Sequence, residues 1–444
     1  MKAFFSNQVL LPEGLQSTTI LVKGGKLERI LPGKVDTGNL EFLDFGNAVI
    51  MPGLIDPHVH INEPGRTEWE GFETGTMAAA AGGVTTIVDM PLNSSPVTTN
   101  VAALQEKLDA AKGKLHVNCG FWGGLTPQSL GDLEGLLETE VLGVKVFLTH
   151  SGIDDFPDIG QSDLSRVMPL IKTSGKPILA HCEISRPHAD QALLENNPTS
   201  YQNYLASRPP SWEIEAIEMM IDLCRTSGCR THIVHLATAE AISSISKAKD
   251  EGLPLTVETC PQYLCFSAEE IPDGQTVYKC APPIREAANQ KQLWEAIKTG
   301  LIDFLATDHS PAPPKLKEID SGNLAKAWGG IAGLQFFLPA IWTKAKTQNL
   351  TLPKLSKLWS SNAAAFLGIG HRKGKIAKGY DADLVIWHPD EQFTVTESMI
   401  FHKHKPTPYL GQQLYGKVML TMVNGQLVYQ NGQIVGRNYG SIVV

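Results

Sequence analysis

The chain has 444 residues, of which 42% are hydrophobic and 19% charged, and this composition is ordinary for a globular protein. Its formal net charge is -8, and no segment gathers Lys and Arg into a stripe, which argues against a nucleic-acid partner. No run approaches the ~18 consecutive apolar residues of a membrane-spanning helix, so we expect no membrane partner.

The two ends of the chain share one sequence pattern. Residues 1–50 form short alternating apolar segments broken by Gly and Pro, and this pattern returns from Gly374 onward. The dipeptides Asn424-Gly425 and Asn431-Gly432 lie between β-branched runs, which is a strong hairpin signal. We therefore predict that residues 1–50 and 372–444 together build one small β-sandwich domain.

Residues 51–371 alternate short apolar runs with stretches of helical periodicity. The runs are rich in β-branched residues and apolar on both faces, as in parallel strands covered by helices. About eight such units fit in this segment, the number found in a TIM-type (β/α)8 barrel. The predicted fold class is therefore α/β, with a barrel over residues 51–371. Clear apolar runs are GVTTIVDMP, VLGVKVFLTH, PILAHCE, THIVHLA, LTVETCP and DFLATDHS.

The first strand of this barrel is expected to end in Asp56-Pro57-His58-Val59-His60. His58 and His60 are two residues apart, so on a strand they project from the same face. Two imidazoles at the end of an apolar strand can bind one metal ion. They could also be core histidines whose nitrogens pair with the backbone. In a parallel barrel, however, the functional residues stand at the carboxyl ends of strands.

Four later runs also end in a residue that suits a metal site, namely Lys145, His181, His235 and Asp308. A single core histidine is usually just hydrogen-bonded within the core. The same residue types at the ends of successive strands are hard to explain in that way. The joint pattern therefore predicts one shared site.

Lys145 requires its own account, because a buried ammonium ion is costly and would repel a metal ion. Its apolar neighbours, from Val144 to Leu148, argue against a surface position. A buried lysine shifts its pKa readily and can then be modified. Carbamylation by carbon dioxide would turn Lys145 into an anion with two oxygens, which can bridge two divalent cations.

The seven cysteines include no C-x-x-C pair and lie mostly in apolar runs. We expect buried, reduced thiols, as is typical of a cytoplasmic protein. The N-terminal segment has a very short apolar run and no small-residue cleavage site, so we expect no secretory signal.

The six candidate ligands resemble the binuclear site of the amidohydrolase superfamily, in the branch of dihydroorotases, hydantoinases and allantoinases. The resemblance covers essentially the whole chain and implies two divalent metal ions. It also implies that a metal-bridging hydroxide is the nucleophile and that Asp308 is the catalytic proton carrier. One metal would be held by His58, His60, carbamylated Lys145 and Asp308, and the other by Lys145, His181 and His235.

Two positions distinguish members of this branch. Dihydroorotases typically have Arg, which binds the substrate carboxylate, where this chain has Asn62, so a neutral substrate fits better. Hydantoinases typically have Tyr as an oxyanion donor five residues after the bridging lysine, where this chain has His150. His150 is either a donor of this kind or an ordinary loop residue.

Six segments resemble allantoinases in particular and occur in the right order. The resemblance implies that the chain hydrolyses allantoin, a neutral hydantoin with a ureido arm, to allantoate in purine catabolism. One departure is Gln262, where His is common in the family, and it lies outside the metal set. The segments are residues 68–76, 90–93, 206–209, 281–285, 307–311 and 326–335.

A neutral hydantoin is recognised by paired donors and acceptors. Asn93 can supply both from one amide, and Asn62 is a second candidate. The backbone at Cys280, Gly330 and Ile331 would cup the ring, with glycine permitting close approach. Alternatively, the glycines serve loop geometry alone.

The resemblance leaves two rival functions. A dihydroorotase or hydantoinase acting on a related cyclic amide is the nearest alternative. An inactive scaffold homologue would normally have lost a metal ligand, and all six are present here. The ligand types suit zinc, cobalt, manganese or nickel, and zinc is the expected ion. By resemblance we also expect a homo-oligomer, specifically a homotetramer.

Overall fold

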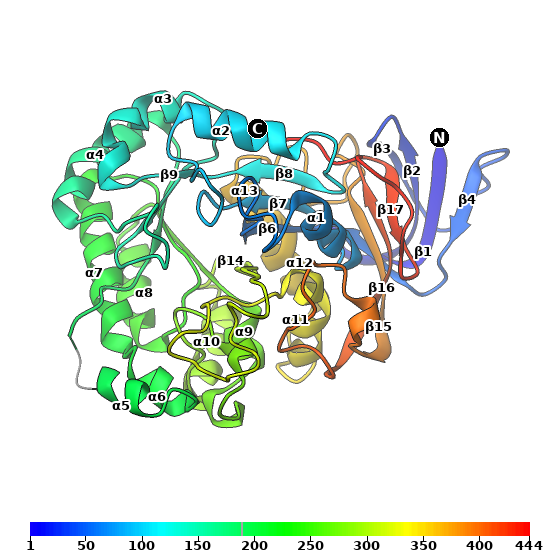
Figure 1. The fold of residues 1–444 in the computed structure, drawn as a ribbon. Coiled ribbons are helices and arrows are strands. Elements are labelled where there is room, and N and C mark those ends of the chain that lie inside the picture. The colour runs from blue at the N-terminus through cyan, green and yellow to red at the C-terminus, as the bar shows by residue number, and fades with distance from the viewer. Residues whose placement is uncertain (188–189) are drawn as a thin grey trace.

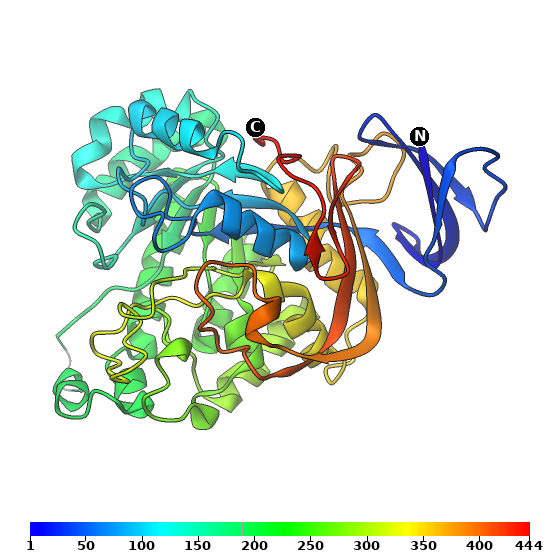
Figure 2. The same ribbon diagram turned by 45° about the vertical axis from the view of Figure 1, so that its right-hand side comes forward.

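The computed structural model describes residues 1–187 and 190–444. Figure 1 shows a barrel of parallel strands beside a sheet built mostly from antiparallel strands. In the view of Figure 2 this second sheet stands to one side of the barrel. The predicted fold class is confirmed, because the barrel comes from the middle of the chain and the sheet from both of its ends.

The barrel strands are buried on both faces, as the sequence predicts for parallel strands under helices. Thr256 is the single residue of these strands that is not fully buried. The strands are β6 (Leu54–Val59), β7 (Val84–Asp89), β8 (Asn118–Phe121), β9 (Gly123–Gly124), β10 (Val144–Phe147), β11 (Ile178–His181), β12 (Thr231–Ile233), β13 (Leu255–Thr259) and β14 (Phe304–Leu305).

Hydrogen bonds group these strands as β6-β7-β8 and β9 to β14, and two contacts complete the ring. Only Trp122 separates β8 from β9, so the two act as one interrupted strand, and the Trp122 indole donates to the Pro57 carbonyl over 2.7 Å. On the other side, Val59 pairs in parallel with His309, just beyond β14. The His60 amide also donates to the His309 carbonyl over 2.8 Å. Eight parallel positions therefore close into a barrel.

Helices cover the outside of the barrel, where Figure 1 shows α4, α7 and α8. The longest of them, α7, begins with Pro210 and ends at Gly228, whose φ of 65° suits a left-handed helix cap. The helices are α1 (Phe72–Ala81), α2 (Val101–Ala111), α3 (Leu133–Leu137), α4 (Gln161–Ser174), α5 (Gln191–Asn196), α6 (Tyr201–Ala206), α7 (Pro210–Ser227), α8 (Ile242–Asp250), α9 (Pro261–Cys265), α10 (Ala287–Thr299), α11 (Phe337–Ala345), α12 (Leu352–Ser356) and α13 (Asn362–Phe366). Short 3₁₀ turns span Pro127–Asp132, Ala239–Ala241, Ala268–Glu270, Thr276–Tyr278, Leu334–Phe336 and Glu397–Met399, and a π turn spans Lys357–Ser361.

The terminal sheet has nine strands in the order β18-β17-β16-β15-β5-β1-β2-β3, with β4 beside β1. The two chain ends meet where β5 pairs antiparallel with β15. Both predicted hairpins are confirmed, because Asn424, Gly425, Asn431 and Gly432 all have positive φ, as type I′ turns require. The strands are β1 (Lys2–Leu11), β2 (Gly14–Lys23), β3 (Lys26–Pro32), β4 (Glu41–Asp44), β5 (Val49–Pro52), β15 (Leu384–Thr394), β16 (Gln413–Val423), β17 (Gln426–Gln430) and β18 (Gln433–Ile434).

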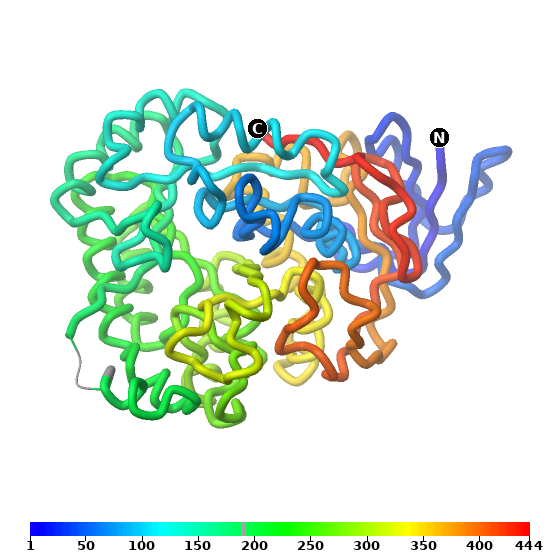
Figure 3. Tube along the Cα trace, viewed as in Figure 1, coloured from blue at the N-terminus to red at the C-terminus, as the bar shows by residue number. Residues whose placement is uncertain are grey.

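The last residues return from this sheet to the barrel (Figure 3), where Ile442 pairs with Cys119 of β8. The division of the chain into residues 1–50, 51–371 and 372–444 remains our proposal. All seven cysteines are buried and free. Among the described residues, no helix combines the length and apolar character needed to cross a bilayer.

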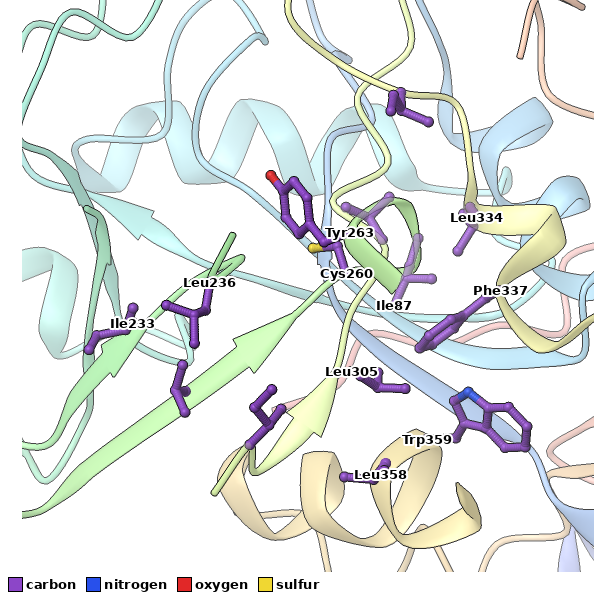
Figure 4. Close-up of a cluster of buried hydrophobic side chains, with 14 of the residues drawn as sticks. Ile87, Ile233, Leu236, Cys260, Tyr263, Leu305, Leu334, Phe337, Leu358 and Trp359 are labelled. Carbon is purple, nitrogen blue, oxygen red and sulfur yellow. The ribbon is translucent and has the colours of Figure 1, made fainter. Parts of the chain in front are cut away.

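The main hydrophobic core runs from the barrel strands into the layer of helices that faces the terminal sheet. In Figure 4, Leu305 of β14 lies between Phe337 of α11 and Leu358 and Trp359 of the π turn. Trp359 is fully buried. This packing joins the wall of the barrel to the helices outside it.

Candidate active site

A cavity of about 660 Å³ lies at the carboxyl ends of the barrel strands. Its wall includes all six residues that the sequence predicts as metal ligands. They lie on or just beyond β6, β10, β11, β12 and β14, which are far apart in sequence, and closure of the barrel brings the six together. They are His58, His60, Lys145, His181, His235 and Asp308.

His58, His60 and Asp308 form one half of this set. The Oδ1 atom of Asp308 lies 3.2 Å from His58 Nε2 and 3.3 Å from His60 Nε2. One potential ligand atom from each residue falls within 4.8 Å of the others, and all three residues are buried. Two imidazole nitrogens and a carboxylate at this spacing are a suitable donor group for a divalent metal ion.

His181 and His235 form the other half. His181 Nδ1 and His235 Nε2 are 2.9 Å apart. The ring centroid of His235 lies 5.5 Å from that of His58, so the two halves adjoin. Phe147 stacks on His181 with a centroid distance of 4.4 Å and an interplanar angle of 11°, which fixes the orientation of that imidazole.

Each of three ligand histidines has a polar partner on the nitrogen that points away from the centre. His58 Nδ1 is 2.5 Å from Glu258 Oε1, and His181 Nε2 is 2.8 Å from Glu183 Oε2. His60 Nδ1 is 3.3 Å from the amide nitrogen of Asn93. A carboxylate on one nitrogen holds the proton there, which leaves the other nitrogen free to bind a metal.

The sequence interpretation missed Glu258 and Glu183. Glu258 lies in the apolar run LTVETCP. A carboxylate in such a run indicates a buried partner, because ionised side chains are rarely buried without one. Glu183 follows His181 by two residues. Burial raises the pKa of Glu183, but Arg208 and His181 outweigh it and hold the pKa at about 2. Glu183 is therefore an anion that anchors His181.

Asp56 was missed as well, and it connects the first strand of the barrel to the segment that follows the last one. Its carboxylate accepts hydrogen bonds from the Thr307 amide (3.1 Å), the Thr307 hydroxyl (2.5 Å) and the His58 amide (3.2 Å). Burial raises the pKa of Asp56 to about 7. The contacts fix the strand that carries His58 against the segment that carries Asp308.

Four residues around the site have unusual backbone geometry. His235 has a φ of 40° and Asp308 a φ of 48°, and both lie within three residues of the end of a barrel strand. Asn62 and Asn93 also have positive φ, at 64° and 69°. Non-glycine residues seldom adopt such angles, and strain of this kind concentrates at functional sites. Here it redirects each side chain at the point where its strand ends.

Lys145 lies at the centre of β10 with 1% of its surface exposed. Its Nζ atom has no hydrogen-bond partner in the described part of the chain. Burial lowers the pKa of Lys145 to about 8, although Asp308 and Glu258 favour its charged form. An appreciable fraction of the amine is therefore uncharged near neutral pH, and this is the form that reacts with carbon dioxide.

Burial also lowers the pKa values of His58, His181 and His235, so these imidazoles are neutral and can donate a lone pair. Burial raises the pKa of Asp308, but His58 and His60 outweigh it and the net shift is downward. Asp308 is therefore an anion at neutral pH. Neutral imidazoles, an ionised carboxylate and an unpaired lysine nitrogen fit a divalent metal centre.

The predicted substrate-binding residues fall into two groups. Asn93 and His150 line the cavity. The buried Oδ1 of Asn93 has no partner among the described residues, whereas His150 is exposed and lies 3.4 Å from Asp154. The structure does not place the other four on the cavity wall, where Ala281 and Gly329 appear next to two of them. These four are Asn62, Cys280, Gly330 and Ile331.

Further side chains of the cavity wall were not among the sequence candidates. Arg208 and Trp328 lie in segments that carry the family resemblance, but no role was assigned to them from sequence. Tyr204 and Trp212 lie on α6 and α7 and Lys279 in a loop, where no sequence pattern marks a residue as functional. The wall thus includes Tyr204, Arg208, Trp212, Lys279 and Trp328.

Comparison with known proteins gives a consistent result. The model of the amidohydrolase family matches residues 49–428. The chain is 44% identical to the allantoinase of Arabidopsis thaliana, over 98% of this chain and 90% of that protein. It is 44% identical to the allantoinase of Streptomyces avermitilis (96% and 95% covered) and 40% identical to that of Saccharomyces cerevisiae (98% and 97%).

Solved structures with the same fold are hydantoinases. The L-hydantoinase (dihydropyrimidinase) from Arthrobacter aurescens superposes with a TM-score of 0.92 at 30% identity, over 100% of this chain and 99% of that one. A D-hydantoinase from Bacillus sp. AR9 gives a TM-score of 0.90 at 28% identity, over 100% and 98%.

Proposed function

Because this chain belongs to the amidohydrolase family, we propose that it is the hydrolase that opens the cyclic amide of allantoin to give allantoate. The observation that carries the proposal is identity of 40–46% to several allantoinases over nearly the whole chain. The cavity supports it, because its histidines, Asp308 and Lys145 stand together at the carboxyl ends of the strands.

We propose that the site holds two divalent metal ions, zinc in the first instance. His58, His60 and Asp308 would hold one ion, and His181 and His235 the other, with carbamylated Lys145 between them. The orientation of His58 by Glu258 and of His181 by Glu183 supports this assignment. When bound, the ions supply Lewis acidity that polarises the amide carbonyl and acidifies a water molecule.

The protein's own contribution to the reaction is to move a proton. Asp308 is ionised, because the neighbouring histidines keep its pKa low. Its carboxylate can therefore accept the proton of the attacking water. The same carboxyl group then donates this proton to the ring nitrogen as the carbon–nitrogen bond breaks. The products are the NH2 group of a new ureido arm and a carboxylic acid, which releases its proton to solvent to become the carboxylate of allantoate, so atoms and charges balance.

Substrate recognition is proposed to rest mainly on Asn93. Asn93 lines the cavity, and its buried Oδ1 has no hydrogen-bond partner among the described residues, so it can accept a hydrogen bond from a ring N–H. The backbone around Cys280 and Ala281, and around Gly329 to Ile331, would contact the ring from the side. Asn62 would support the substrate site from behind the cavity wall, where its amide donates to the Pro311 carbonyl over 3.5 Å. His150 would contact the substrate at the entrance of the cavity.

From the same family relationship we also propose that the protein forms a homotetramer and that it is located in the cytoplasm. Light scattering coupled to size exclusion measures the first, and an eluting mass of four chains is expected.

A panel of three substrates tests the proposed reaction. The metal-loaded protein should hydrolyse allantoin with a higher kcat/KM than either hydantoin or dihydroorotate. Two solved structures with this fold are hydantoinases, so hydantoin hydrolysis is the second candidate function. Product formation should be followed as allantoate by chromatography. A preference for hydantoin or dihydroorotate would replace allantoin as the proposed substrate.

Acid is expected to remove the metal ions and the activity together. The pKa values of His58, His181 and His235 lie below the ordinary 6.5, so these ligands stay neutral until the pH falls below that value. Further acidification protonates them and ejects the ions. Metal analysis after dialysis at stepped pH, with kcat at each step, checks this. A metal content that is constant down to about pH 4 would contradict the assignment of these histidines as ligands.

A further inference from the structure

One wall of the cavity carries a cation that has no part in the metal site. Among the described residues that line the cavity outside the six ligands, Lys279 is the buried charged side chain, whereas Glu195 and Lys326 are exposed. The partly exposed Arg208 is its charged neighbour. An ion that is kept away from water in a binding cavity is costly unless it has a partner.

The ammonium group of Lys279 has hydrogen-bond donors to spare. It donates to the Ala327 carbonyl over 2.5 Å and lies 5.3 Å from the centre of the Tyr204 ring. An ammonium group has three N–H donors. Among the described residues, the Ala327 carbonyl is the one acceptor for Lys279 Nζ, so two donors remain unused. Burial first, and Arg208 second, lower the pKa of Lys279 to about 8, so the charged form still prevails at neutral pH.

A second buried lysine nearby shows what a purely structural role looks like. Lys317 Nζ donates to the carbonyls of Lys279 (2.7 Å), Trp328 (3.0 Å) and Gly330 (2.5 Å), so all three of its donors are used within the protein. Lys317 does not line the cavity. It joins the segment around Lys279 to the segment 327–330, whereas Lys279 faces the cavity with donors unused.

The position of Lys279 restricts what it can contact. The amide bond that is cleaved must lie at the six ligand residues, so this wall meets a part of the substrate outside that bond. Arg208 is engaged by Glu183 through its Nε and Nη2 atoms. Among the described residues Lys279 has no carboxylate of its own, so it adds a positive charge that favours a hydrogen-bond acceptor. Outside the cleaved amide, allantoin offers the second ring carbonyl and the carbonyl of the ureido arm, and only the ureido carbonyl is absent from hydantoin.

We propose that Lys279 is a specificity-determining residue, whose Nζ donates a hydrogen bond to the carbonyl oxygen of the ureido arm. This inference rests on the proposed function. A site built around such a donor favours the substrate that has the acceptor, because without it a buried charged group is left unpaired. Lys279 would thus separate allantoin from hydantoins that lack the arm.

The test compares Lys279→Met with the native chain on two compounds. Allantoin is the substrate, and hydantoin, which lacks the ureido arm, is measured as a competitive inhibitor. We expect Lys279→Met to lower kcat/KM for allantoin by about 10- to 100-fold, mainly through KM. The inhibition constant of hydantoin should change by less than about threefold, because hydantoin has no ureido carbonyl to accept a hydrogen bond from Lys279.

Lys317→Met is the matched comparison, since it removes a buried lysine from the same wall without removing a donor from the cavity. It should weaken allantoin and hydantoin to a similar extent. Lys279→Arg keeps a charged donor and should recover part of the allantoin affinity. If Lys279→Met does not fold, Lys279→Arg carries the test, and its KM for allantoin must change more than its hydantoin inhibition constant.

The inference would be overturned, with the proposed function left intact, if the variant changed KM for allantoin and the hydantoin inhibition constant equally. That variant is Lys279→Met, or Lys279→Arg if Lys279→Met does not fold. A native enzyme that does not hydrolyse allantoin would overturn both.

Discussion

Lys145→Ala is expected to lose both bound metal ions and nearly all hydrolysis of allantoin. Lys145 sits 1% exposed in an apolar strand, and its Nζ has no hydrogen-bond partner among the described residues. Carbamylation gives this position a bridging anion, and alanine cannot replace it. Without metal ions the pKa of water returns from about 7 to ~15.7, so attack at neutral pH becomes slower by many orders of magnitude. Metal analysis and kcat measured on the same preparation check this.

Two controls sharpen the Lys145 experiment. Lys375→Ala removes an exposed lysine at a distance from the cavity and should leave metal content and kcat unchanged. Acetate or propionate added to Lys145→Ala should restore a part of the activity, because a small carboxylate can occupy the vacated bridging position. The carbamate assignment fails if Lys145→Ala retains two tightly bound metal ions per chain. It also fails if a metal-loaded structure shows unmodified Lys145 pointing away from the ions.

Asp308→Asn is expected to lower kcat by about 10²- to 10⁴-fold, because the amide cannot carry the proton from water to the leaving nitrogen. The change should leave the fold intact. Asp308 has a φ of 48°, and Asn tolerates this backbone region as well as Asp does. Thermal unfolding and steady-state kinetics on allantoin measure the two effects separately.

Asp109→Asn is the matched control for Asp308, since Asp109 is a carboxylate on the outer helix α2 and does not line the cavity. Its kcat should equal that of the native chain. An Asp308→Asn enzyme that keeps more than about a tenth of the native kcat would exclude Asp308 as the proton carrier.

Much of the fold could be predicted, because local patterns set it. Strands such as β7 and β10 are apolar on both faces and read directly as buried parallel strands. The Asn-Gly dipeptides of the terminal hairpins require positive φ and were readable one by one. The pairing of β5 with β15 was different. It joins segments more than 300 residues apart, and alternation of apolar residues does not name the partner strand.

The ligand residues could be predicted for a similar reason, since the histidines and Asp308 stand near the ends of apolar runs and Lys145 is a charged residue inside one. Their supporting contacts were not. Glu258 reaches His58 across 200 residues of sequence, and Asp56 reaches Thr307 across 251. These pairs exist only because the barrel closes. The positive φ of His235 and Asp308 is likewise imposed by the surrounding structure, because His and Asp tolerate such angles but do not require them.

The role proposed for Lys279 could not be predicted from the sequence either. In sequence it is one lysine in a stretch without helical or strand periodicity, and Lys317 is another. Only the fold separates them, because three carbonyls surround the ammonium group of Lys317 while that of Lys279 faces the cavity.

The central claim is that this site binds two metal ions and uses them to hydrolyse allantoin. A titration of metal-stripped protein with zinc, with allantoate formation measured after each addition and bicarbonate present for Lys145, tests it most directly. The rate should be negligible at the start and rise to a plateau when two ions are bound per chain. Full allantoin hydrolysis by the stripped protein, or none at any zinc ratio, would contradict the account.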